Sequence, residues 1–230
     1  MPLLNLCGVT GNKKTIQTAL CFLSGEKKED YEWAMTQFKE LLEKHDIPWP
    51  LSIVTDRELA LMNALEKVFP DVVHILCTWH VNMNILANCR KHFQKDLKEP
   101  EQTSPQGYIT DPKWESFLKD WSALLNASTE EEYEAQLKSF RKHPQKAVDY
   151  VESTWLIWKE KLIRYWVDMN PHFGIRVTSP LEGCHATLKA YLKVSTSDLK
   201  GVFDRLLPFW RQQHKAIMHT IAYEQNLTKH

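Results

Sequence analysis

The segment from Leu51 to His80 constrains the fold most, because it places two short apolar runs on either side of one amphipathic stretch. The first run, Leu51–Val54, predicts a buried strand that leads directly to the carboxylate of Asp56. The second run, Val72–Leu76, predicts another buried strand. The apolar residues between them follow helical spacing: Leu59, Met62, Ala64, Leu65 and Val68. A strand, a helix and a strand at this length predict a βαβ unit with parallel strands and a right-handed crossover.

The residues before this unit predict a hairpin and a helix. Leu3–Thr10 and Thr15–Ser24 are apolar runs separated by a Gly-Asn turn signal, which favours an antiparallel pair. Lys28–Lys44 predicts a helix, and its apolar stripe consists of Tyr31, Ala34, Phe38, Leu41 and Leu42. Because Met1 directly adjoins the first strand, the sheet is expected to lack its first element.

The rest of the chain is predicted to be helical. A helix follows Cys77, and the stretch from about Pro112 to Trp166 shows no strand pattern. One amphipathic helix is expected from the spacing of Val148, Val151, Trp155, Trp158, Leu162 and Tyr165. Further helices are expected from Pro180, with Ser179 as the N-cap, and over Ser197–Gln225.

The predicted fold class is therefore α/β, a mixed sheet flanked by helices and interrupted by an all-α insertion. The expected boundaries are residues 1–97 for the N-terminal part of the core and 98–170 for the helical insertion. Residues 171–230 are expected to contribute C-terminal helices that complete the core.

The charge balance gives no overall support for a strongly basic nucleic-acid-binding protein. The chain has 29 basic and 29 acidic residues, so it lacks the overall basic signature typical of nucleic-acid-binding domains. Residues 183–230 nevertheless contain seven Lys and Arg against three acidic residues, which predicts either a local basic face or an ordinary solvated helix face. Five cysteines without a signal-peptide pattern favour a reducing compartment, and no apolar run is long enough for a membrane helix.

Two carboxylates are candidate metal ligands. Asp56 lies at the carboxyl end of a predicted strand, where α/β proteins place functional residues, and hard cations such as Mg²⁺ prefer oxygen ligands. Thr55 to Glu58 also fits the capping-box pattern, so Asp56 can equally be a first-turn residue that stabilises the helix dipole. Glu182 lies near a predicted helix start, with His185 and Lys189 on the same face, and the same alternative applies to it.

Cys77 and His80 form a Cys-x-x-His pair, which is half of a typical zinc site. His74 and the Cys184-His185 pair are the candidates for the remaining zinc ligands. The alternative is that Cys77 and His80 are buried residues at a helix start that pack and form hydrogen bonds.

Lys189 and Lys193 are the candidates for contacts to phosphate groups, with a solvated face as the alternative. The sequence contains no Gly-rich phosphate loop, no nucleophile-elbow serine motif and no His-Glu-x-x-His motif. Serine hydrolase, kinase and zincin functions therefore have no support.

The ordered motifs of the chain resemble one known family. They are the tyrosine–tryptophan helix at Tyr31, the T-D-R strand end at Asp56, the C-x-W-H pair at Cys77 and the T-S-x-x-E helix start at Glu182. In this order they are similar to the transposase domain of Mutator-like elements and to the far-red-impaired-response group of domesticated transposases. The resemblance covers about residues 1–93, with a second block at 175–195.

The resemblance implies an RNase H-like core with a DDE-type metal site. Asp56 and Glu182 would be two of its catalytic carboxylates and would hold Mg²⁺ or Mn²⁺, with Cys77 and His80 as a structural signature. The metal ions would activate water, and then a 3′-hydroxyl, for attack on DNA phosphates. The implied partners are transposon ends and target DNA, with a homo-oligomer as a further expectation. The implied location is the nucleus, and no membrane partner is expected.

One departure from the family pattern concerns catalysis. The family's first catalytic aspartate has no counterpart in these 230 residues, because it would precede the segment at Met1, and Asp30 falls in a predicted helix. The prediction is therefore an incomplete transposase domain that does not cleave DNA as this chain. The rival hypothesis is a domesticated, non-catalytic protein that keeps the fold for regulatory contacts with DNA or proteins.

Overall fold

The computed structural model describes residues 1–9, 14–93, 111–192 and 198–227, and it divides into two compact units. Unit 1 consists of Met1–Glu26 and Ser179–His230, so it joins both ends of the sequence. Unit 2 is the intervening stretch, Lys27–Thr178.

Unit 1 is built on a β-hairpin. Strand β1 (Leu3–Val9) pairs antiparallel with β2 (Thr15–Phe22), as the two apolar runs predict. The pairing register shifts between Leu6 and Cys7, which marks a local irregularity of the hairpin. The predicted Gly-Asn turn lies outside the described residues.

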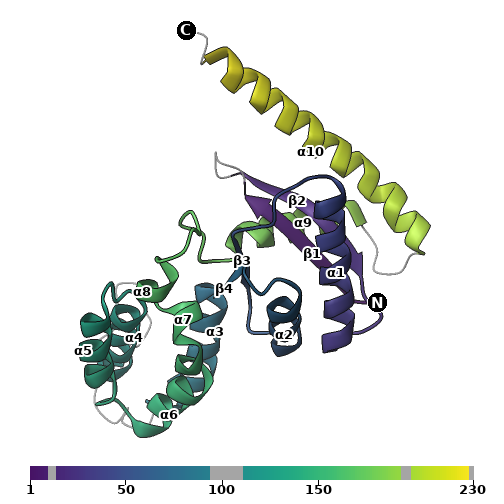
Figure 1. The fold of residues 1–230 in the computed structure, drawn as a ribbon. Coiled ribbons are helices and arrows are strands. Elements are labelled where there is room, and N and C mark those ends of the chain that lie inside the picture. The colour runs from purple at the N-terminus through teal and green to yellow at the C-terminus, as the bar shows by residue number, and fades with distance from the viewer. Residues whose placement is uncertain (10–13, 94–110, 193–197, 228–230) are drawn as a thin grey trace. The chain divides into compact units, whose positions relative to one another are not determined.

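Two helices complete unit 1, and glutamine side chains attach the second of them to the hairpin. Helix α9 spans Ser179–Leu192 and α10 spans Leu199–Leu227, and Figure 1 shows α10 running beside β2. The side-chain amide of Gln213 accepts from the Gln17 backbone N–H and donates to the Gln17 carbonyl, both at 2.9 Å. The Trp210 indole N–H donates to Oε1 of Gln17 at 2.7 Å. Gln17 is only 5% exposed, so these bonds satisfy polar groups that would otherwise be buried without partners.

Unit 2 contains the predicted βαβ unit. Strand β3 (Ser52–Thr55) pairs parallel with β4 (Val73–Leu76), and α2 (Leu59–Val68) connects them. Helix α1 (Lys28–Lys44) has the predicted bounds and packs on α2. The α/β class is thereby confirmed at the level of small sheets with many helices.

Two predicted core positions on these helices are wrong. Leu41 of α1 is 46% exposed and Leu59 of α2 is 47% exposed. The buried stripe of α1 passes through Met35 instead of Leu41, because Tyr31, Ala34, Met35 and Leu42 share the face that packs on its neighbours. Leu59 is the first residue of α2, and the buried residues of this helix begin at Leu61.

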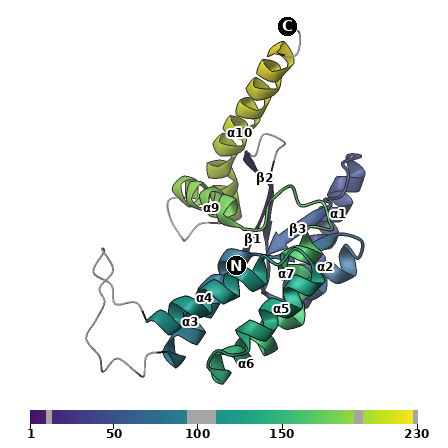
Figure 2. The same cartoon turned by 90° about the vertical axis from the view of Figure 1, so that its left-hand side faces the viewer.

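The remainder of unit 2 is helical. Helix α3 (Thr78–Cys89) continues into the short 3₁₀ helix η1 (Arg90–His92). Two longer helices follow, α4 (Pro112–Leu125) and α5 (Glu130–Phe140), and Figure 2 shows α3 and α4 side by side. The remaining elements are α6 (Gln145–Thr154), η3 (Leu156–Trp158), α7 (Lys159–Leu162) and α8 (Arg164–Val167).

The single amphipathic helix expected over Val148–Tyr165 is wrong, because the structure divides it into short pieces. Helix α6 ends at Thr154, and Ile163 is in an extended conformation with ψ 136°. The Ser153 hydroxyl donates to the Asp149 carbonyl at 2.6 Å, a local bond that competes with the regular helix pattern. Aromatic and β-branched residues dominate the stretch after Thr154, and their low helix propensity favours a broken path that still buries Trp155 and Leu162.

An aromatic cluster forms the core of the helical part. Phe117 is completely buried, and its ring lies within 5.4 Å, centroid to centroid, of Phe93, Trp114, Phe140 and His143. Among the described helices of the chain, none combines the length and the apolar character needed to cross a membrane.

Replacing Phe117 with alanine should lower the free energy of unfolding by about 3–5 kcal/mol, because a large fully buried ring leaves a cavity. Urea denaturation monitored by circular dichroism measures this loss. Trp33→Ala is the matched control, since Trp33 is 56% exposed and its removal should change stability by less than about 1 kcal/mol. Equal losses in the two variants would contradict the assignment of the core.

Replacing Gln213 with leucine should lower the free energy of unfolding by about 1–3 kcal/mol, because the buried backbone groups of Gln17 lose their partners. Faster hydrogen exchange of the Gln17 amide should accompany the loss. Gln212→Leu serves as the control, because Gln212 is exposed and, among the described residues, accepts only from the Tyr191 hydroxyl. A Gln17 amide that exchanges at the same rate in both variants would show that Gln213 does not hold α10 on the hairpin.

Candidate functional site

Asp56 follows directly after the end of β3, in the connection to α2. Its side chain is exposed, and no hydrogen bond or ion pair joins its carboxylate to another described residue. The predicted capping box is wrong, because α2 begins at Leu59 and its N-cap is Glu58, whose carboxylate accepts from the Ala60 N–H at 3.2 Å. Asp56 therefore does not lie in the first helical turn, and the helix-dipole interpretation of it loses its basis.

A buried histidine fixes the backbone beside Asp56. The Thr55 hydroxyl donates to the Asp56 carbonyl at 2.6 Å and lies 2.7 Å from Nε2 of His74. Because a hydroxyl has one proton to donate, Nε2 of His74 must carry a proton and donate it to Thr55. Nδ1 of His74 is then an acceptor, and it is buried without a partner among the described side chains.

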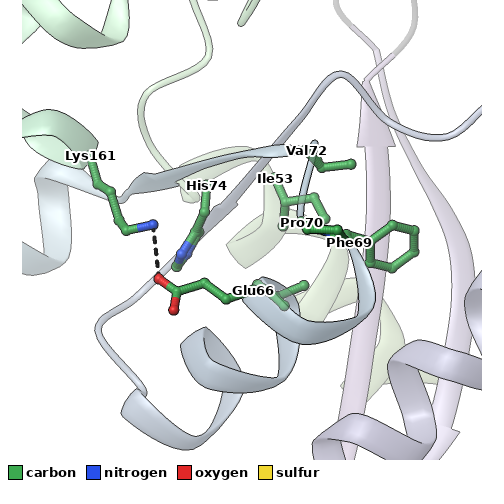
Figure 3. A pocket seen from close by; sticks show the side chains of 8 residues that line it. Ile53, Glu66, Phe69, Pro70, Val72, His74 and Lys161 are labelled. Carbon is green, nitrogen blue, oxygen red and sulfur yellow. Dashed lines mark ion pairs between the residues drawn. The ribbon is translucent and has the colours of Figure 1, made fainter.

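The surroundings of His74 keep its imidazole neutral. Burial lowers the pKa of His74 from 6.5 to about 4, and the positive charge of Lys161 acts in the same direction. The ring lines a cavity of about 60 Å³ together with Glu66 and Lys161, whose ion pair measures 3.3 Å (Figure 3). A cavity of this size has room for a water molecule that could donate to Nδ1 of His74.

Cys77 connects the strand pair to a segment about 100 residues later. Its backbone N–H donates to the Thr55 carbonyl at 2.7 Å, which extends the β3–β4 pairing by one residue. Its sulfur is fully buried and accepts from both the N–H and the hydroxyl of Thr178, each at 3.2 Å. The Thr178 hydroxyl also lies 3.3 Å from Nδ1 of His80. Both residues of the Cys-x-x-His pair thus contact the side chain of Thr178.

The neighbouring residues attach the same segment. The N–H and the hydroxyl of Thr78 both donate to the Arg176 carbonyl, at 3.0 and 3.1 Å. The Arg176 guanidinium donates to the Leu162 carbonyl at 2.8 Å. Residues 176–178 are therefore bound to the start of α3 and to the end of α7.

A groove of about 380 Å³ lies between α3 and α4, close to this attachment. Thr78 and Arg176 contribute to one part of its wall, and Asn82 and Trp121 form a hydrogen bond of 2.9 Å across it. The lining is neutral apart from Arg176, so the groove has none of the acidic groups that a divalent cation needs.

The second candidate carboxylate belongs to unit 1. Glu182 lies in the first turn of α9, and Lys189 lies further along the same helix with an exposed side chain. Lys193 falls outside the described residues. The functional roles of Asp56, Glu182, Lys189 and Lys193 stay predictions.

The metal chemistry of the described residues can be tested against their geometry. An exposed, unpaired carboxylate such as Asp56 suits one position in the shell of a hard cation, which needs several oxygen ligands. Within the part of the chain that the structure describes, no group of three or more His, Cys, Asp or Glu side chains comes together. Asp56 therefore fits as a single ligand, and Cys77 and His80 direct their bonds to Thr178.

Two residues of the site do not follow from sequence reasoning. Thr178 stands in a polar stretch that predicts a loop, and its contact with Cys77 spans 101 positions. The signal that could have identified it is its place in the T-S-x-x-E motif, directly before the helix of Glu182. His74 shows only as a polar residue within an apolar strand, and a buried polar residue needs a partner, here Thr55.

His74 predicts a specific pH dependence of stability. The unfolded chain binds a proton on this residue below about pH 6.5, whereas the folded chain does so only near its pKa of about 4. The stability contributed by neutral His74 is therefore complete above about pH 6.5 and is lost as the pH falls toward 4.

His74→Gln keeps a donor for Thr55 without a titrating ring, so it should reduce the loss of stability over this range by up to about 3 kcal/mol. Urea denaturation at a series of pH values measures the effect. His45→Gln, at the exposed end of α1, controls for the removal of a histidine. The same pH dependence in wild type and His74→Gln would contradict the buried, neutral state of His74.

Comparisons with known proteins match the N-terminal part of the chain to one family model. The MULE transposase domain matches residues 1–84, a segment that contains Asp56, Cys77 and His80 and ends before Glu182. FAR1-related sequence 5 from Arabidopsis thaliana is 26% identical over 129 residues, which is 55% of this chain and 16% of the plant protein.

A fungal protein matches over a longer stretch. The PKS-NRPS hybrid synthetase cheA of Chaetomium globosum is 26% identical over 207 residues, which is 84% of this chain and 4% of the fungal protein. The chain spans only a small part of either relative, so the synthetase activity in the fungal name describes that protein and not this chain. The domain match over residues 1–84 and the plant relative confirm the resemblance that the ordered motifs predict, and this part of the chain is similar to the MULE transposase domain.

Proposed function

We propose that this chain is a transposase-derived protein that acts on DNA and retains two carboxylates of a metal-dependent strand-transfer site, Asp56 and Glu182. The observation that carries the proposal is the exposed, unpaired carboxylate of Asp56 at the end of a parallel strand, within the segment that matches the MULE transposase domain. Ends of parallel strands are where α/β proteins bind ligands and perform chemistry.

An RNase H-like core is part of the same proposal. The order of elements supports it: an antiparallel hairpin, a helix, a parallel strand pair joined by a helix, a helical insertion, and a helix that carries Glu182. This is the order that the resemblance to Mutator-like transposases implies.

The implied cofactor is Mg²⁺ or Mn²⁺. Asp56 and Glu182 would hold it, because carboxylate oxygens are the ligands that hard divalent cations prefer. A bound ion would supply Lewis-acid stabilisation of charge on a DNA phosphate. The residues of this chain would supply a fixed carboxylate, since the Thr55–His74 pair holds the backbone at Asp56.

The distribution of charge supports DNA as the partner. Unit 1 contains nine Lys and Arg against five Asp and Glu, whereas unit 2 contains 20 against 24. In α10, residues 205–223 include no acidic residue. The basic excess therefore lies in the unit that carries Glu182 and Lys189, which suits contact with phosphates. A nuclear location and a homo-oligomer follow from the transposase resemblance.

The second candidate function is a domesticated, non-catalytic regulator that binds DNA or protein. The observation that favours it is the solitary position of Asp56, because no cluster of three potential metal ligands exists among the described residues. The similarity to FAR1-related sequence 5 agrees with this alternative. The two candidates share DNA binding and differ in whether Asp56 and Glu182 still serve as metal ligands.

The proposal predicts salt-sensitive DNA binding by the 230-residue chain. Lys189→Ala should weaken binding about several-fold and reduce the dependence of log K on log salt by about 1, because one phosphate contact is lost. Fluorescence anisotropy with duplex DNA at several salt concentrations measures both quantities. Lys119→Ala, an exposed lysine of α4 in the acidic unit 2, should leave both quantities unchanged. Absence of DNA binding would overturn the proposal.

A nicking assay tests whether the chain keeps strand cleavage, a result that would exclude the second candidate. With Mg²⁺ or Mn²⁺ and supercoiled plasmid, we expect no nicking by the chain, because its 230 residues contain two of the three implied carboxylates. Metal-dependent nicking that disappears in Asp56→Asn would establish a catalytic protein and exclude the non-catalytic regulator.

A further inference from the structure

Two sequence motifs that lie about 100 residues apart are joined through Thr178, the last residue of unit 2. The first is the Cys-x-x-His pair at the start of α3, and the second is the T-S-x-x-E stretch that begins at Thr178. Thr178 is 8% exposed and forms three side-chain or backbone contacts of 3.2–3.3 Å with Cys77 and His80. Ser179, the next residue of the chain, is the first residue of α9.

Cys77 binds two separate segments of the chain, one through its backbone N–H and the other through its sulfur. Its N–H donates to the Thr55 carbonyl, and Thr55 directly precedes Asp56. Its sulfur accepts from Thr178, which precedes Glu182 by four positions. Cys77 therefore binds both Thr55, at the strand end that carries Asp56, and Thr178, the last residue of unit 2.

The protons in this cluster can be assigned. The Thr178 hydroxyl donates its single proton to the Cys77 sulfur, so it must accept from Nδ1 of His80. His80 is then protonated at Nδ1. His80 thus donates to Thr178, and Thr178 donates to Cys77. The Thr178 N–H is a second donor to the same sulfur.

We propose that Cys77, His80 and Thr178 form a latch that fixes Thr178, the residue that leads into α9, which makes Cys77 and His80 positioning residues for this backbone and not metal ligands. Any functional role of the helix that follows rests on the proposed function. The latch itself consists of hydrogen bonds within unit 2 and operates without DNA or metal.

The geometry favours the latch over a zinc half-site. A zinc-bound thiolate and imidazole direct the sulfur and one ring nitrogen to the same ion. Here the sulfur and Nδ1 are both directed to the Thr178 hydroxyl. His74, the nearest other candidate ligand in the sequence, donates to Thr55 instead.

Site-resolved amide hydrogen exchange on the full 230-residue chain tests the latch. Thr178→Val keeps the shape of the side chain but removes the hydroxyl and its bonds to Cys77 and His80. We expect the amides of Thr178 and of the first two turns of α9 to exchange about ten-fold faster or more. Thr178→Ser restores the hydroxyl and should restore slow exchange.

Thr187→Val is the matched control, because the Thr187 hydroxyl lies on α9 and donates only to the Gly183 carbonyl. It should leave the exchange of Thr178 unchanged. The Gln17 amide of unit 1 reports on intact folding in every variant. Unchanged exchange at Thr178 and α9 in Thr178→Val, or slow exchange that Thr178→Ser fails to restore, would overturn the latch.

Elemental analysis of the purified chain is an independent test of whether Cys77 and His80 bind zinc. We expect no stoichiometric zinc, and zinc that is present in the wild type and lost in Cys77→Ser would overturn the proposal. Neither measurement uses DNA, so a failure of the latch and a failure of the proposed DNA function can be told apart.

Discussion

The bonds that Cys77 makes through its backbone and its sulfur are the constraint on which the candidate site depends. Its N–H extends the pairing of β3 with β4, so the residue has a fixed position at the end of a sheet. Its sulfur, fully buried, must find donors inside the protein, and it finds two on Thr178. A sulfur atom is large and a weak acceptor, which allows two donors at 3.2 Å where an oxygen would hold them more closely.

The carboxylate of Asp56 has no hydrogen-bond or ion-pair partner among the described residues. The residue before it is fixed by His74 and by the N–H of Cys77, yet its carboxylate remains exposed without a bond to any described residue. A rigid backbone with one free functional group is the arrangement that a binding site requires, because little conformational entropy is lost when a ligand binds. The neutral state of His74 agrees with this arrangement, since a buried imidazolium at the strand end would carry a large desolvation cost.

Local patterns predict the elements of this fold well and their contacts poorly. The hairpin, the bounds of α1 and the parallel strand pair follow from apolar periodicity, because one face of each element must be buried. The start of α2 does not follow, since Glu58 provides the cap in place of Thr55. The break after Thr154 does not follow from apolar spacing, because the Ser153 bond and the low helix propensity of the next residues act against a continuous helix. Of the site, Asp56 and Cys77 are visible as motif residues, whereas Thr178 is identified only by a contact across 101 positions.

The amide pairing between Gln213 and Gln17 has a consequence for how the hairpin can associate with other strands. A side-chain amide that binds both the N–H and the carbonyl of one residue occupies the same groups that an added strand would use. Helix α10 therefore blocks strand addition along that edge of β2, and an incoming strand would first have to displace the helix.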